Sequence, residues 1–140
     1  MFRHGVASGD PMADRVILWT RVTPTEQAAP GSGIGDLVVV DWEVSTDPGF
    51  ATIVRSGTVT TDAGRDHTVK LDCVGLAPDR WYHYRFHALG QTSRTGRTRT
   101  APADGAMPAT GRWRVGVVSC SNWEAGYFTA YRYLADEAEA

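Results

Sequence analysis

The sequence predicts a mainly β protein, an antiparallel β-sandwich followed by the first strand and helix of a truncated α/β domain. Up to about residue 100, apolar and polar residues alternate in short runs separated by turn residues, as in strands with one buried face. A stretch rich in alanine, proline and glycine follows. The pattern then changes to a continuous apolar run and to apolar residues at helical spacing.

Composition places the chain among ordinary globular proteins. It has 140 residues, of which 42% are hydrophobic and 21% charged, a length that fits one domain or slightly more. Its formal net charge of −2 argues against a nucleic-acid partner, which usually requires a basic surface. No apolar run approaches the roughly 20 residues of a membrane-spanning helix, and no signal peptide is visible. We therefore expect neither a specific nucleic-acid partner nor a membrane span.

The sandwich strands follow from the period of two. In the most regular run, Tyr82, Tyr84 and Phe86 alternate with polar neighbours, so one face is predicted to be buried. Turn signals such as Asp47-Pro48-Gly49 separate the runs. Short strands at regular spacing predict an antiparallel sandwich. The predicted strands cover residues 16–21, 38–45, 52–61, 69–73 and 81–88.

A local signature narrows the type of sandwich. Leu76 and Pro78 precede a strand whose first inward residue is Tyr82. This arrangement predicts a tyrosine corner, in which the phenol forms a hydrogen bond with backbone a few residues upstream. Together with the strand lengths, the corner makes the region similar to a fibronectin type III domain.

The remaining residues divide into a linker and a short α/β unit. We assign residues 1–102 to the sandwich and 103–112 to the linker. Residues 113–140 are predicted to form the first βα unit of a truncated domain, with an apolar strand at 113–118 and a helix carrying Phe128, Tyr131 and Leu134 on one face. About 30 residues are too few to bury a core of their own.

Cys120 is the main candidate for chemistry because it follows the apolar strand, where open α/β sheets place their functional residues. A thiolate suits iron, copper(I) or zinc. Nucleophilic catalysis would need a positioned base, yet every histidine lies in the sandwich region. A small buried residue at a strand end is the non-functional alternative. The histidines are His4, His67, His83 and His87.

Three further residues favour structural roles. Cys73 shares a strand face with Val69 and Leu71, so we expect it in the core. A disulfide between Cys73 and Cys120 would cross the domain boundary and is not expected. His83 and His87 are four residues apart on one strand, roughly 13 Å, which is too far for a shared metal, so we expect an exposed strand face.

Several polar and aromatic residues also have structural interpretations. Arginines 94, 97 and 99 are typical of a charged edge strand that discourages aggregation. Ser8-Gly9-Asp10-Pro11 has the composition of a turn. Trp123 and Tyr127 could line a pocket, but packing at the strand-to-helix turn is the favoured interpretation.

Two segments resemble one enzyme family. FRHGVASGDPMADRVILWTRVTP, residues 2–24, is similar to the opening of the PhoD-type alkaline phosphatases. WRVGVVSCSNWEAGYFTAYRYLADE, residues 113–137, is similar to the start of that family's metallophosphatase domain. The resemblance covers the whole chain and implies an N-terminal fibronectin-like domain that packs against a larger metallophosphatase domain.

This resemblance also implies function. Family members hydrolyse phosphomonoesters and phosphodiesters at alkaline pH with iron and calcium, and by position Cys120 corresponds to an iron ligand. The other ligands, including the Asp of a Gly-Asp-(Tyr/His) segment, are absent from this chain, so we expect it to be inactive alone. The implied partners are a phosphate ester and the rest of the metallophosphatase domain. The implied location is secreted, periplasmic or at the cell surface, after twin-arginine export.

Two other functions stay open at this point. A fibronectin-like domain without a complete enzyme would be a non-catalytic binding or spacer module. A thiol-based redox protein using Cys120 would need an activated thiolate without a metal.

Overall fold

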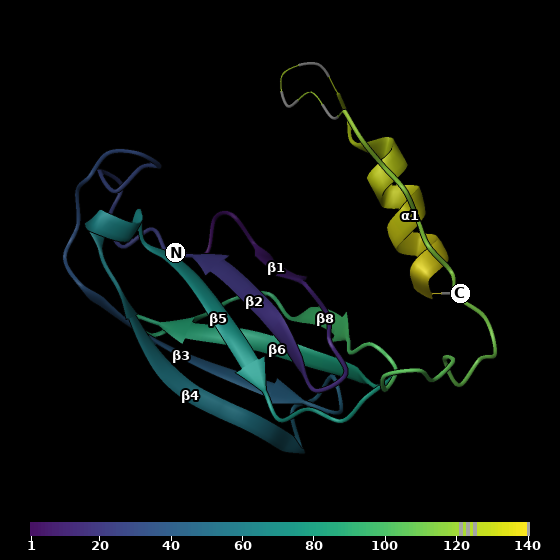
Figure 1. Cartoon of the computed structure of the whole chain (residues 1–140). Coiled ribbons are helices and arrows are strands. Elements are labelled where there is room, and N and C mark those ends of the chain that lie inside the picture. Colours follow the sequence, from purple (N-terminus) through teal and green to yellow (C-terminus); the bar gives the residue numbers. More distant parts are fainter. Residues whose placement is uncertain (121, 123, 125, 140) are drawn as a thin grey trace.

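Two facing antiparallel sheets form the sandwich, and the C-terminal helix lies apart from them (Figure 1). The computed structural model describes residues 1–120, 122, 124 and 126–139. One sheet has the order β1-β2-β5, and the other β4-β3-β6-β7 with β8 also pairing with β6. The elements are β1 (Val6–Gly9), β2 (Arg15–Arg21), β3 (Val38–Ser45), β4 (Ile53–Thr61), η1 (Ala63–Arg65), β5 (Thr68–Val74), β6 (Trp81–Ala88), β7 (Gln91–Thr92), β8 (Gly96–Arg99) and α1 (Thr129–Glu139).

The core lies between the two sheets and is built from the inward positions of their strands. The alternation predicted for the strand at 81–88 is confirmed, since Tyr82, Tyr84, Phe86 and Ala88 are all buried. Burial of this apolar surface supplies the main stabilising free energy of such a domain. The core cluster comprises Val16, Leu18, Val22, Val38, Val40, Val44, Val69, Cys73, Leu76, Tyr82, Tyr84, Phe86 and Ala88.

The predicted tyrosine corner is confirmed. The backbone N–H of Ala77 donates to the hydroxyl of Tyr82 at 2.8 Å, and this hydroxyl lies 3.5 Å from the carbonyl oxygen of Ala77. Thr100 completes the corner, because its hydroxyl donates to the same carbonyl at 2.7 Å. The corner fixes the connection between β5 and β6, which belong to different sheets.

Short strands were missed by the alternation pattern. β1 occupies Val6–Gly9 and pairs with β2, Val6 opposite Thr20 and Gly9 opposite Ile17. The turn predicted for residues 8–11 is therefore wrong at Ser8 and Gly9, which are paired, while Asp10 has a positive φ of 48°. Four residues that include serine and glycine carry too little pattern to indicate a strand, and the ladder with β2 decides the outcome.

An ion pair between the buried Arg21 and the partly exposed Asp66 anchors the long loop between β2 and β3. The side chain of Arg21 is 4% exposed, and its Nη2 lies 3.0 Å from Oδ1 of Asp66. The same nitrogen donates to the carbonyl of Ala28, and Asp66 accepts the N–H of Gly31. The Arg21 guanidinium and the Gly31 N–H hold the pKa of Asp66 below its usual value. This cluster keeps the loop folded over the end of the sheet.

The C-terminal unit forms its helix but not its strand. α1 covers Thr129–Glu139, which confirms the predicted helix for Tyr131 and Leu134, whereas Phe128 precedes the helix with a φ of +52°. Residues 113–118 have no ladder partner, and Val115 and Val117 are 77% and 86% exposed. The strand predicted at 113–118 is therefore not formed, because the described residues supply no neighbouring strand with which it could pair. No helix in the described part of the chain has the length and apolar character to cross a membrane.

We expect Tyr82→Phe to lower the free energy of unfolding by roughly 1–3 kcal/mol, because the Ala77 N–H loses its acceptor at a partly buried site. Urea unfolding measures the change. Tyr133→Phe removes the same hydroxyl from an exposed position of α1 and is the matched control. Equal stability of the two variants would contradict the role assigned to the corner.

The second prediction concerns Gly35, where φ is +122° and an added Cβ would lie 2.5 Å from Nε2 of the buried His67. Gly35→Ala should destabilise the protein by on the order of 2–3 kcal/mol through strain and overlap. Gly33→Ala is the control, because Gly33 also has a positive φ but meets nothing within 4 Å. It should cost about 1 kcal/mol. Thermal unfolding measures both effects, and equal melting temperatures of the two variants would contradict the predicted overlap with His67.

Candidate functional site

The candidate site lies where the segment after the linker meets the start of α1. The two run side by side, because a Cβ at Gly116 would overlap the side chain of Leu134. Arg114 adds an ion pair with Glu137, with Nη2 and Oε2 3.6 Å apart. Glycine at position 116 therefore allows the helix to approach the backbone, and the βα unit packs against itself without a sheet.

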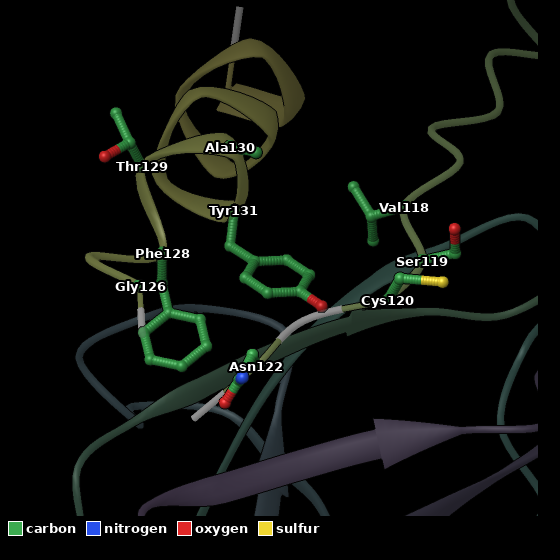
Figure 2. A pocket seen from close by; sticks show the side chains of 9 residues that line it. All are labelled: Val118, Ser119, Cys120, Asn122, Gly126, Phe128, Thr129, Ala130 and Tyr131. Atoms are coloured by element: carbon green, nitrogen blue, oxygen red, sulfur yellow. The ribbon is translucent and has the colours of Figure 1, made fainter. Parts of the chain in front are cut away.

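A pocket of about 390 Å³ opens at the end of this contact. Figure 2 shows its lining: the segment carrying Cys120 forms one wall, and the first turn of α1 forms the other. The residues that line it are Val118, Ser119, Cys120, Asn122, Gly126, Phe128, Thr129, Ala130 and Tyr131. The pocket is therefore lined by residues before and after the connection that leads from segment 113–118 to α1.

Cys120 is an exposed free thiol on the wall of this pocket. Its φ of +57° is unusual for a residue with a side chain, and such conformations are found preferentially at functional sites. In the view of Figure 2 its sulfur projects away from the ring of Tyr131. The alternative of a buried residue at a strand end does not hold, since the side chain is open to solvent.

The residues present do not by themselves fit an iron or calcium centre. No group of three or more His, Cys, Asp or Glu side chains that could hold a metal occurs among residues 1–120, 122, 124 and 126–139. Cys120 supplies one soft ligand, and calcium requires six or more oxygen ligands. All four histidines belong to the sandwich region, so the segment around Cys120 has no histidine that could act as a base or a second ligand.

Aromatic residues line the pocket, but they are not the ones singled out from the sequence. Phe128 and Tyr131 stack with ring centroids 5.9 Å apart and an interplanar angle of 27°. Tyr127 is 96% exposed, so it neither lines the pocket nor packs at the turn. Trp123 lies outside the described residues. The helical spacing of Phe128 and Tyr131 was the only sequence signal for their shared position.

Cys73 is a core residue, as expected. It is 1% exposed, and burial raises the pKa of its thiol to about 11. Both cysteines are free, so the expectation of no disulfide between them is confirmed. A buried, protonated thiol is inert, so Cys120 is the only one of the two cysteines that is open to solvent.

His83 and His87 lie on the outer face of the sheet containing β6, but this face is half-buried rather than exposed. Nε2 of His87 lies 3.1 Å from Oε1 of Glu43, and Arg85 forms an ion pair with the same carboxylate. Partial burial raises the pKa of Glu43, but hydrogen bonds from Arg85 and His87 outweigh this effect and lower it. The cluster ties β3 to β6 and leaves Glu43 ionised.

The charged edge strand is present as β8, which pairs with β6 and carries Arg97 and Arg99, while Arg94 lies between β7 and β8 and outside both. Arg97 and Arg99 lie over the ring of Trp81, with the guanidinium carbons 4.5 and 5.6 Å from its centroid. Cation–π contacts of this kind stabilise an exposed strand modestly. These arginines therefore belong to the structure of the sheet edge.

Comparison with known proteins connects this architecture to one family. Residues 1–102 match the family model described as PhoD-like phosphatase, N-terminal domain. Alkaline phosphatase D of Bacillus subtilis (strain 168) is 41% identical over 137 residues, which cover 97% of this chain and 23% of the relative. The chain therefore spans about a quarter of the length of this relative.

Solved structures agree. A structure of PhoD superposes with a TM-score of 0.80 at 39% identity, covering 96% of this chain and 25% of the other. A human fibronectin type III domain superposes with a TM-score of 0.53 at 14% identity and 83% coverage of each chain, a likeness of fold alone. The sandwich topology, the tyrosine corner and these matches lead to one assignment: the chain belongs to the PhoD-like phosphatase family, through that family's N-terminal domain.

Proposed function

We propose that this chain is the N-terminal portion of a metal-dependent hydrolase of phosphate esters, acting on phosphomonoesters or phosphodiesters. One observation carries the proposal. The likeness to alkaline phosphatase D extends over 137 of the 140 residues, so it includes the βα unit and Cys120 as well as the sandwich. A sandwich recruited for another purpose would have no reason to keep this unit, which buries no core of its own.

Within this proposal, Cys120 is a ligand of the iron in a centre that also contains calcium. Three features of the residue support it: the exposed thiol, the strained backbone and the position in a pocket at the start of α1. The remaining ligands would come from residues beyond this chain, as would the rest of the metallophosphatase domain that covers the apolar segment 113–118. The protein would be secreted, periplasmic or displayed at the cell surface, after export by the twin-arginine route.

The first test is to determine the coding sequence after Ala140, which distinguishes the two candidate functions. The proposal expects an open reading frame that soon encodes an apolar strand ending in Gly-Asp and an aromatic residue or histidine. A stop codon directly after Ala140 would instead favour the second candidate, a non-catalytic binding or spacer module. The absence of a cluster of three metal-binding side chains among the described residues is the observation that favours this candidate.

We expect the 140-residue chain alone to show no hydrolysis of a chromogenic phosphodiester, even with added iron and calcium. Metal catalysis needs an ion held by several ligands with an open position for water, and one thiolate does not provide this. Alkaline phosphatase D of Bacillus subtilis serves as the positive control in the same assay. A turnover comparable with that of the control would overturn the prediction.

In a longer protein that contains this chain, Cys120→Ser should lower the iron bound per molecule, because a hydroxyl is a poorer ligand for iron than a thiolate. Cys73→Ser is the matched control, since Cys73 is buried in the sandwich core. Metal analysis of the purified variants measures the effect. Unchanged iron content in Cys120→Ser would remove Cys120 from the proposed centre while leaving the family assignment intact.

A further inference from the structure

The connector, residues 101–112, contacts the sandwich at its start and again at residues 108 and 109, while residues 103–107 between these two points are exposed. Its composition predicts a linker. At its start, the N–H of Ala101 donates to the carbonyl of Met12 at 3.1 Å, and the carbonyl of Ala101 accepts the N–H of Asp79 at 2.9 Å. Pro102 and Pro108 are both buried. The connector therefore leaves the sandwich after Pro102 and returns to it at Pro108 and Ala109.

The side chain of Asp79 makes the second contact, with the backbone of Ala109. Its side chain is 16% exposed. One carboxylate oxygen accepts a hydrogen bond from Nη2 of Arg99 at 2.6 Å, and the other accepts the backbone N–H of Ala109 at 2.7 Å. The carboxylate thus bridges Arg99 at the end of β8 and Ala109, which lies 30 residues after Asp79 in the chain. Hydrogen bonds to an ionised acceptor are about twice as strong as those between neutral groups.

The backbone that carries Asp79 is itself held in place. Asp79 has a φ of +53° and lies in the tyrosine corner, between Ala77 and Tyr82. Thr100 bonds the corner on both sides of Asp79: its hydroxyl donates to the carbonyl of Ala77 and accepts the N–H of Arg80 at 3.1 Å. The carboxylate therefore cannot follow a moving connector without disturbing the corner.

The negative charge of the Asp79 carboxylate stabilises its contact with Ala109 at neutral pH. The Ala109 N–H hydrogen bond and the Arg99 guanidinium outweigh partial desolvation and lower the pKa of Asp79. The carboxylate is then ionised, with both oxygens acting as acceptors. A group with a lowered pKa loses this stabilisation only when the pH falls through its value in the folded protein.

We propose that Asp79 is a clamp that fixes the connector to the sandwich, so that the chain leaves the sandwich at residue 110 in one direction. The clamp fixes the position of Ala109 relative to the sandwich. Flexibility between the sandwich and the segment carrying Cys120 is thereby confined to the residues that follow Ala109. This inference concerns only the described residues and does not depend on the enzymatic proposal.

The test is amide hydrogen exchange of the 140-residue chain, followed residue by residue by NMR. In the unaltered chain the N–H of Ala109 should be protected. Asp79→Ala should raise its exchange rate roughly tenfold or more, the factor expected for a lost hydrogen bond to a charged group. Asp79→Asn, which keeps one acceptor oxygen, should have a smaller effect. Asp104→Asn, an exposed change in the same connector, is the matched control and should leave the rate unchanged.

A second measurement decides the matter if Asp79→Ala fails to fold. In the unaltered chain the chemical shift of the Ala109 N–H should titrate together with the carboxyl carbon of Asp79, at a pH below the usual range of an aspartate. Coupled titration supports the clamp. The clamp is overturned if the Ala109 N–H is unprotected in the unaltered chain. It is also overturned if the chemical shift of this N–H does not change as Asp79 titrates.

Discussion

The hydrogen bond between the Tyr82 hydroxyl and the backbone of Ala77 is the constraint on which the rest of the molecule depends. It fixes the crossover between β5 and β6, and so the relation of one sheet to the other. It also holds Asp79 in a left-handed conformation from which the carboxylate reaches the connector. Sheet packing and the exit of the chain therefore depend on a single corner, which explains why so many polar contacts converge there.

The strands that carry a long alternating pattern could be predicted from the sequence, because burial of one face leaves a period of two. This holds for residues 81–88, where the inward positions are all buried. The sequence could not predict β1 or β7, which have four and two residues and exist because neighbouring strands offer hydrogen bonds. The same distinction explains the outcome at the C-terminus, where the predicted helix forms and the predicted strand does not. α1 forms from local hydrogen bonds, whereas residues 113–118 need partners that the described residues do not supply.

Polar contacts were the least predictable part of the fold and of the candidate site. Arg21 with Asp66, and Asp79 with Ala109, join residues 45 and 30 positions apart, and no local pattern indicates such pairs. At the site, Cys120 was identifiable from its place after an apolar run, and the structure adds its exposure and its pocket. Phe128 and Tyr131 became pocket residues only through the turn that starts the helix, which the sequence does not specify.

The exposed segment 113–118 has a consequence for handling the isolated chain. Val115 and Val117 present apolar side chains to solvent beside backbone without a ladder partner. Such a stretch can pair with the same stretch of another molecule, which is the usual route to edge-to-edge aggregation. The sandwich protects its own edge with arginines at β8, whereas the apolar segment has charged residues only at its start, Arg114 within it and Arg112 just before it. Self-association at high concentration would therefore originate in the short C-terminal unit, while the sandwich stays folded.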